Sequence, residues 1–227
     1  MTTSQAVTLE YNVTELIEEA YERAGIDVQM LNAHHMRSAR RSMNLIFSSW
    51  ANKGIRLWAL DQQTQTVTDG DPTYTLPAGT VDVLDAVLTR DSVDTPMHRI
   101  SRTDYHVIPD KTQEGRPDRF WVDRQIGTQT MYVWPTPENS TDVIDYWRLR
   151  RLYDVTAATE TADVPQRAWE ALTCDLAERL LLKRPDDQIS QVRLSELKSA
   201  RRESFYDMRT EDRDRAPSQV YPEQRRI

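Results

Sequence analysis

Four histidines are the first residues in this sequence to consider for chemistry, because histidine is a common metal ligand and general base. His34 and His35 are adjacent. Adjacent side chains on a helix point about 100° apart, so these two rings cannot chelate one ion as an i, i+4 pair does. His98 and His106 lie in another part of the chain, and no HExxH motif is present. We therefore expect no metal site and no cofactor.

Two pairs of adjacent carboxylates, Glu18-Glu19 and Asp186-Asp187, are the next candidates. A glycosidase uses two carboxyl groups as acid and nucleophile. Such pairs are more typical of a solvated helix face and of a helix cap. The sequence also contains no GxxxxGKS/T, GxGxxG or GxSxG motif. The residues therefore predict that the protein is not an enzyme.

Arginines gather beside aromatic residues near position 150. Arg148, Arg150 and Arg151, together with Trp147 and Tyr153, resemble a surface on which single-stranded nucleic acid stacks. On an alternating strand, however, Arg148 and Arg150 share one face and Trp147 lies on the other, as in a half-buried interface strand. The formal net charge of −7 makes the average surface repel phosphate. We therefore favour a protein interface, with Arg148 and Arg150 as contact residues.

The composition limits the class of protein. A chain of 227 residues with 38% hydrophobic residues can bury a substantial core. No apolar run reaches the roughly 18 residues of a membrane span, and residues 1–12 do not form a signal peptide, so we expect a soluble chain. The single cysteine, Cys174, excludes an internal disulfide and is expected to be a small buried hydrophobe. Basic residues are mostly arginine, which suits bidentate contacts in protein interfaces.

Two helices must position the N-terminal part of the chain. Asn12 and Glu15 have the spacing of a capping box, and the helix that they begin should end at Gly25. Residues 36–54 form the organising core helix, because their apolar side chains fall on a single stripe. The stripe comprises Met36, Ala39, Met43, Ile46, Phe47 and Trp50. Helical geometry places Leu45 opposite this stripe, and Gly54 should end the helix.

The middle of the chain has the alternation of β-strands. Residues 63–68 and 74–76 are predicted to form a hairpin around the turn Asp69-Gly70. Further strands are predicted at residues 81–90, 120–122, 131–134 and 142–153. Short strands separated by turn residues indicate an antiparallel sheet or a small sandwich.

Helical spacing returns after Asp163, which is expected to cap a helix with Trp169, Leu172, Leu176 and Leu180 on its apolar side. A last helix, capped by Asp186 or Asp187, should end near Arg209. The predicted fold is α+β. A helical bundle from N- and C-terminal helices (residues 1–55 and 155–210) carries an inserted antiparallel β domain (56–154). Residues 211–227 form an extended C-terminal arm.

Several of these segments together resemble a known family. The run MNLIFSSWANKG resembles the second helix of the tailed-phage head-to-tail connectors, also called tail accessory or portal adaptor proteins. The resemblance continues through TELIEEAYERAG, DGDPTYTLP, EGRPDRFWVDR, YVWPTPE and DVPQRAWEALTCDLAERL. No single segment is a chemical signature, but their order and spacing match the family over most of the chain.

The resemblance implies a structural virion protein of the phage neck or tail, assembled in the host cytoplasm. It would form a homo-oligomeric ring of about twelve subunits, because head-to-tail contacts that close by rotation give cyclic rings. Its partners would be the portal protein, the next tail component (a nozzle or tail tube) and copies of itself. Duplex DNA would pass through the channel without specific binding, and no membrane would be involved. In such a ring, Leu45 is a natural intersubunit contact.

The C-terminal arm is the expected portal-binding element. Its composition cannot bury enough apolar surface to order the segment alone. Val220, Tyr221 and Ile227 are anchors of the kind that fill pockets, and Arg225 and Arg226 can pair with carboxylates.

Two alternative functions belong to other classes. Phage tail proteins sometimes cleave peptidoglycan, so a virion-associated peptidoglycan hydrolase is one alternative, for which the sequence offers only generic carboxylates. The other alternative is a nucleic-acid-binding protein whose basic patch is hidden by an acidic average charge.

Overall fold

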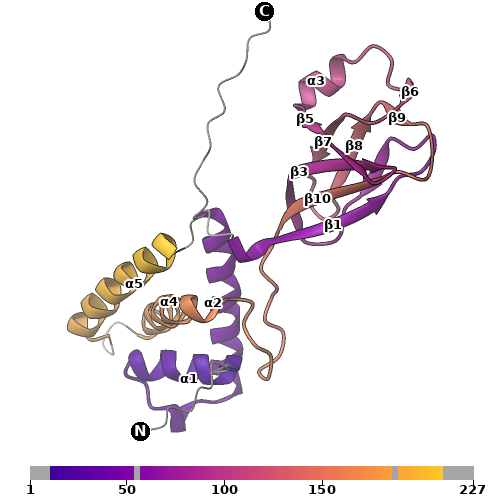
Figure 1. Ribbon diagram of the computed structural model, residues 1–227. Coiled ribbons are helices and arrows are strands. Elements are labelled where there is room, and N and C mark those ends of the chain that lie inside the picture. Colours follow the sequence, from indigo (N-terminus) through magenta and orange to yellow (C-terminus); the bar gives the residue numbers. More distant parts are fainter. Residues whose placement is uncertain (1–10, 54–56, 186–188, 212–227) are drawn as a thin grey trace, which may run out of the picture. The chain divides into compact units, whose positions relative to one another are not determined.

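The computed structural model describes residues 11–53, 57–185 and 189–211. Within these residues the chain forms five α-helices and ten strands, and most strand pairs are antiparallel, so the predicted α+β class is confirmed. The chain divides into two compact units (Figure 1). The helical unit takes its described residues from Met1–Ile46, Thr156–Thr161 and Pro165–Ile227, and the β unit from Phe47–Val155 and Ala162–Val164.

The first helix, α1 (Val13–Arg23), begins at the predicted capping box. The Asn12 side chain accepts a hydrogen bond from the backbone N–H of Glu15, and the Glu15 carboxylate accepts one from the N–H of Asn12, both at 2.9 Å. Gly25 has a φ of +74°, the left-handed conformation that commonly follows a helix end. The apolar side of α1 is buried and consists of Val13, Leu16, Ile17, Ala20 and Tyr21.

The second helix, α2 (Ala33–Asn52), is the predicted organising helix. Its cap is Asn32, whose Oδ1 accepts hydrogen bonds from the backbone N–H groups of His34 and His35 at 2.9 and 3.1 Å. Met36 is half-buried, and the rest of the predicted stripe is buried: Ala39, Met43, Ile46, Phe47 and Trp50. The periodicity therefore identified the core side of this helix correctly. Gly54 lies outside the described residues.

The helical unit is centred on α4 (Trp169–Leu181), which packs against α1 and against α5 (Gln191–Glu211) (Figure 1). All residues of α4 except Glu170 and Arg179 are buried. Helix α5 buries only Leu194, Leu197 and Met208. A short 3-10 turn, η3 (Gln166–Ala168), precedes α4 and has Pro165 at its N-cap, so the expectation that Asp163 caps this helix is wrong. Asp186 and Asp187 lie outside the described residues.

The β unit contains two four-stranded sheets. The first sheet has the order β1 (Leu60–Thr66), β10 (Val143–Arg150), β3 (Thr80–Arg90) and β4 (Val93–Pro96). The second has the order β2 (Thr73–Thr75), β8 (Thr130–Trp134), β7 (Arg119–Asp123) and β5 (His98–Arg99). The remaining elements are η1 (Val28–Met30), η2 (Leu57–Ala59), α3 (Arg102–Val107) and the pair β6 (Glu114–Gly115) and β9 (Thr136–Pro137). The pairs β5–β7 and β6–β9 are parallel.

Buried residues from both four-stranded sheets form one hydrophobic cluster. Val83, Leu88, Ile144 and Tyr146 come from the first sheet. Tyr74, Phe120, Val122, Met131 and Val133 come from the second. Because β7, β8 and β10 each contribute alternate residues to this cluster, the two sheets pack as a small sandwich.

The predicted hairpin around Asp69-Gly70 is wrong. The turn is present, with a φ of +76° at Gly70, but the strands on its two sides do not pair with each other. β1 pairs with β10, and β2 pairs with β8. The chain therefore crosses from one sheet to the other at this turn, because both segments find their partners far away in the sequence.

A buried ion pair fastens the end of β3 to the segment before β10. Asp142 is 1% exposed, and its carboxylate accepts hydrogen bonds from Arg90 Nε and Nη2 at 2.9 and 2.7 Å. The Asn139 side chain accepts a bond from the N–H of Asp142 at 3.0 Å. The exposed Glu138 binds the same guanidinium at 2.7 Å. The hydrogen bonds to Asp142 and then to Glu138 raise the pKa of Arg90, so the guanidinium stays charged.

We expect Asp142→Asn to lower the free energy of unfolding by about 1.5–3 kcal/mol, because it removes the charge that satisfies a partly buried guanidinium. Urea denaturation measures the change. Glu138→Gln is the matched control, since it alters an exposed partner of the same Arg90 and should cost less than about 1 kcal/mol. Equal losses in the two variants would contradict this account of the buried pair.

Candidate functional site

The predicted intersubunit residue Leu45 lies on the exposed side of α2. It is 62% exposed. Arg37 and Arg41 precede it at four-residue intervals and are exposed on the same side of the helix. We call Arg37, Arg41 and Leu45 the basic face of α2. The helix contains no aspartate or glutamate, and neither Arg37 nor Arg41 has an ion pair within the part of the chain that the structure describes.

The predicted interface residue Arg148 is buried within its own unit. Its side chain is 7% exposed, and its Nε lies 2.6 Å from Asp61 Oδ1. Nη1 also donates to Thr80 Oγ1 at 3.0 Å, and the Asp61 carboxylate raises the pKa of Arg148. The residue follows Ile144 and Tyr146 on the inward face of β10, whereas Trp147 is 46% exposed. The predicted alternation is therefore present, and the arginine side of the strand is the one that faces the core.

The second predicted arginine, Arg150, is paired with Asp163. Nη1 and Nη2 lie 2.5 and 3.2 Å from the two carboxylate oxygens, and the guanidinium covers the Tyr153 ring at 4.4 Å. The backbone N–H of Tyr153 donates to Asp163 Oδ2 at 2.9 Å. This arrangement explains why Asp163 does not cap α4. It also gives the guanidinium and the aromatic ring a structural role within the chain.

The residues considered for metal or acid–base chemistry lie apart. His34 and His35 begin α2, His98 belongs to β5 and His106 to α3. No group of three histidine, cysteine, aspartate or glutamate residues that could hold a metal occurs within the described ranges. Cys174 is 1% exposed, as expected, and burial raises the pKa of its thiol.

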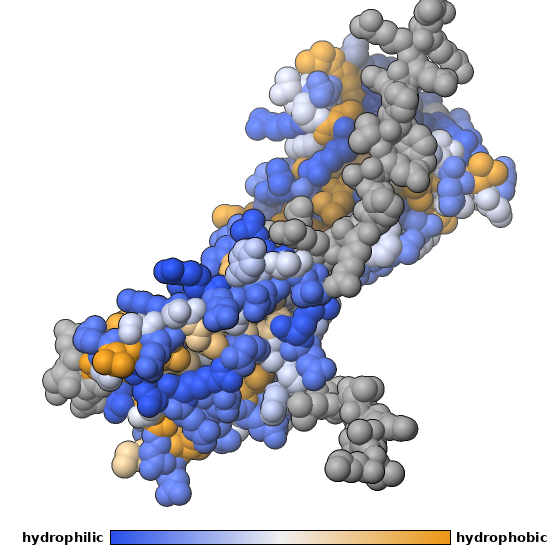
Figure 2. All heavy atoms as spheres, turned by 60° about the vertical axis from the view of Figure 1, so that its left-hand side comes forward, coloured by the Kyte–Doolittle hydropathy of each residue, from blue (hydrophilic) through white to orange (hydrophobic). Residues whose placement is uncertain are grey.

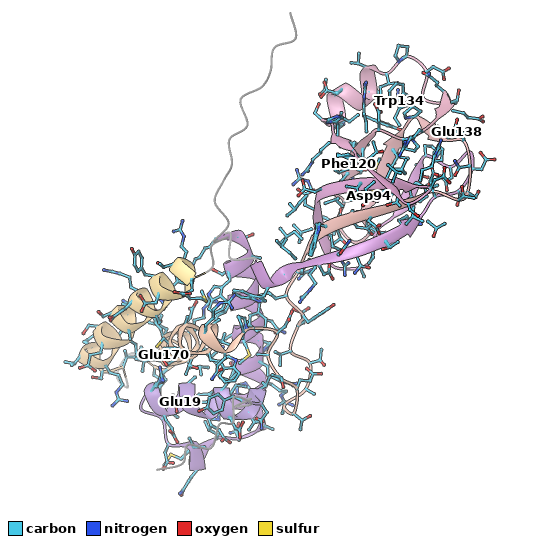
Figure 3. The ribbon with its side chains drawn as sticks, viewed as in Figure 1. Glu19, Asp94, Phe120, Trp134, Glu138 and Glu170 are labelled. Carbon is cyan, nitrogen blue, oxygen red and sulfur yellow. The ribbon has the colours of Figure 1, made fainter. Side chains whose placement is uncertain are left out.

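An acidic groove that the sequence did not reveal lies between α1 and α4. Its volume is about 350 Å³. Its lining includes Glu15, Glu18, Glu19 and Glu22 of α1, Glu170 and Trp169 of α4, and Tyr11. Arg23 is the one cation among the lining residues, and it binds Glu19 at 2.7 Å and Glu170 at 2.6 Å. This pairing lowers the pKa of Glu170. Figure 3 labels Glu19 and Glu170, which come from the two neighbouring helices.

A ladder of three aromatic rings lies on the second sheet of the β unit. Trp121 and Tyr132 are register partners on β7 and β8, and their ring centroids are 4.9 Å apart. Tyr105 of α3 stacks on Trp121 at 5.5 Å. All three residues are half-buried. Sequence reasoning identified both strands but not their register, so it did not predict this cluster.

Comparison with known families decides the class of protein. A family model described as "SU10 adaptor protein" matches residues 11–223, which is most of the chain and includes both units. The chain belongs to the SU10 adaptor protein family. This is a family of phage head-to-tail adaptors, so the resemblance to connectors inferred from the sequence is confirmed. No curated protein matches the chain.

Membership of the SU10 adaptor family makes this protein a bacteriophage virion component that takes part in tail assembly and contacts other neck or tail proteins. The family is a structural one and is not known for enzymatic activity. No helix among the residues that the structure describes is long and apolar enough to cross a membrane. The predicted arm residues of this SU10 adaptor, Val220, Tyr221, Arg225, Arg226 and Ile227, lie outside the described residues.

Proposed function

We propose that this protein forms a ring beneath the portal of a tailed phage, joins the DNA-filled capsid to the tail and leaves a channel for the genome. The observation that carries the proposal is the match of an adaptor family to residues 11–223. Such a match extends over both compact units, so the proposed role belongs to the whole chain and not to one module. About twelve copies would suit a twelvefold portal.

The proposal assigns different contacts to different parts of the chain. The bundle of N- and C-terminal helices, residues 1–55 and 155–210, packs against the portal. The inserted β domain, residues 56–154, faces outward toward a nozzle or tail tube. The arm, which begins after Glu211 and comprises residues 212–227, reaches along the portal. The exposure of Leu45 supports its place between subunits. Arg148 and Arg150 of β10 stabilise the β domain from within, because their guanidinium groups pair with Asp61 and Asp163.

Mixing the purified protein with its cognate portal tests the proposal. Size-exclusion chromatography with light scattering should give a complex that exceeds the portal mass by about twelve times the 26.4 kDa of this chain. Bovine serum albumin at the same concentration serves as the non-binding control. Elution of the portal at its own mass, with the adaptor separate, would show that the protein does not dock there.

We expect weak binding to duplex DNA at physiological salt, because a conduit for a moving duplex should not hold it through many phosphate contacts. The net charge of −7 motivates this expectation. Fluorescence anisotropy with a labelled duplex across a salt series measures it. A variant that lacks residues 212–227, and hence four arginines, should behave like the wild type. Tight binding with a steep salt slope would favour the nucleic-acid-binding alternative.

A further inference from the structure

The acidic groove carries charge that the described part of the chain leaves unpaired. Arg23 neutralises part of the charge of Glu19 and Glu170. Glu18 and Glu22 have no ion pair among the described residues. They lie one helical turn apart on α1, so the groove presents a short row of carboxylates at one edge. A cationic partner would bind most favourably at this edge.

A polar group in the wall of the groove also lacks a partner. Trp169 lines the groove, is 9% exposed, and has a buried indole Nε1 that finds no hydrogen-bond acceptor among the residues that the structure describes. A buried donor without an acceptor is costly, and such groups are rare in folded proteins. Tyr11, whose ring lies edge-on to Trp169 at 5.1 Å and which is 39% exposed, adds an apolar wall. The groove therefore offers carboxylates and an aromatic surface to a bound partner.

The basic face of α2 has the complementary chemistry. Arg37, Arg41 and Leu45 combine two guanidinium groups, which form no ion pair in the described ranges, with an exposed apolar side chain. Lys183 lies beside this face: its ammonium donates to Ser38 Oγ at 2.9 Å, and its pKa is lowered first by burial and then by the nearby Arg41. The row from Arg37 to Leu45 is about 12 Å long, and the row from Glu15 to Glu22 is about 10 Å long.

One face of the molecule shows how polar its surface is. On the face shown in Figure 2, hydrophilic residues cover most of the area and hydrophobic ones form small patches. Contacts between copies on such a surface depend on complementary charge and on a few apolar anchors.

We propose that the basic face of α2 in one copy docks into the acidic groove of the next copy. Arg37 and Arg41 would pair with Glu18 and Glu22, and Leu45 would pack against the Tyr11 and Trp169 rings. The two surfaces differ and belong to the same chain, so the contact is heterologous and repeats from copy to copy, as in a closed ring. This inference rests on the proposed function, for which it names the contact between subunits.

Charge reversal tests this contact directly. One variant carries Arg37→Glu and Arg41→Glu, a second carries Glu18→Arg and Glu22→Arg, and a third carries all four substitutions. Each two-site variant alone brings like charges together and should weaken ring assembly on the portal roughly a hundredfold. An equimolar mixture of the first two should assemble again, because each face then meets a groove of opposite charge. The four-site variant should also assemble alone.

The control variants are Arg202→Glu and Glu196→Arg, which reverse exposed charges on α5 and should assemble like the wild type. Circular dichroism verifies that every variant is folded. Loss of assembly in the two-site variants without recovery in the mixture or in the four-site variant would mean that the groove receives another partner, such as the arm or the portal, and would overturn the proposal. Full assembly of either two-site variant alone would do the same.

A parallel measurement separates this contact from the proposed function. Sedimentation velocity at high protein concentration and low salt, without portal, compares the two-site variants alone with their mixture. Association only in the mixture supports the contact even if no variant binds the portal, in which case the proposed function fails by itself. Portal binding by the wild type, together with no preference for the mixture in either experiment, leaves the proposed function intact and rejects the contact.

Discussion

Replacement of Trp50 by alanine is expected to lower the free energy of unfolding by about 3–5 kcal/mol, as truncation of a buried aromatic side chain does. Trp50 is 0% exposed and is among the largest fully buried side chains of the protein. It lies in the apolar stripe of α2, the helix that contributes residues to both units. Its truncation would leave a cavity that the surrounding side chains fill only partly.

Thermal denaturation of the isolated chain measures this effect. A loss of that size corresponds to a decrease in melting temperature on the order of 10 °C for a chain of this length. Leu45→Ala is the matched control, because Leu45 is 62% exposed on the same helix and its truncation should change the free energy of unfolding by about 0.5 kcal/mol or less. A Trp50→Ala variant that melts within a degree or two of the wild type would show that the stripe does not support the core.

Local signals in the sequence predicted the helices well. The capping box at Asn12 and Glu15 depends on residues three positions apart, and the stripe of α2 on spacings of three and four. Both signals act within a few helical turns, so the rest of the chain does not need to be known. The alternation of strands β3, β7, β8 and β10 is equally local, and all four were predicted near their observed positions.

The pairing of strands that are distant in the sequence could not be predicted from such local signals. Thr64 of β1 lies opposite Asp145 of β10, and its hydroxyl donates to that carboxylate at 2.6 Å across 81 positions of sequence. The turn residues Asp69-Gly70 gave a strong local hairpin signal, but a turn does not determine which strands pair when longer partners are available. The hairpin prediction failed because tertiary pairing overrode it.

In the candidate site, too, local features were predictable from the sequence, and contacts between distant segments were not. Exposure of Leu45 follows from one helix, and the sequence was sufficient to predict it. The partners of Arg148 and Arg150 were not predictable, because only the folded chain brings Asp61 and Asp163 next to these arginines. The acidic groove likewise needs α1 beside α4: Arg23 and Glu170 are 147 positions apart in the chain.

Removal of residues 212–227 is expected to abolish portal binding, or to weaken it greatly, while the isolated chain keeps its melting temperature. The deletion begins after Glu211, the last residue of α5, so it leaves that helix intact. The removed sequence is polar, alternates in charge near its start and contains two prolines, a composition that contributes little to a folded core. If the segment orders only on the portal, its ordering cost is met only when the partner is present, which suits subunits that must stay separate until the portal is complete.

Point variants show how much of the lost portal binding is due to the aromatic anchor and how much to the charged residues of the arm. Tyr221→Ala should weaken portal binding more than Gln219→Ala, the neighbouring control, because aromatic anchors dominate the binding energy of such segments. Arg225→Ala with Arg226→Ala should reduce binding most at low salt, since screening weakens exposed charge pairs as salt rises. Binding is measured by chromatography with light scattering at several salt concentrations. If the truncated protein assembles on the portal with wild-type affinity, the arm is not the docking element, and the exposed helical faces become the surface to mutate next.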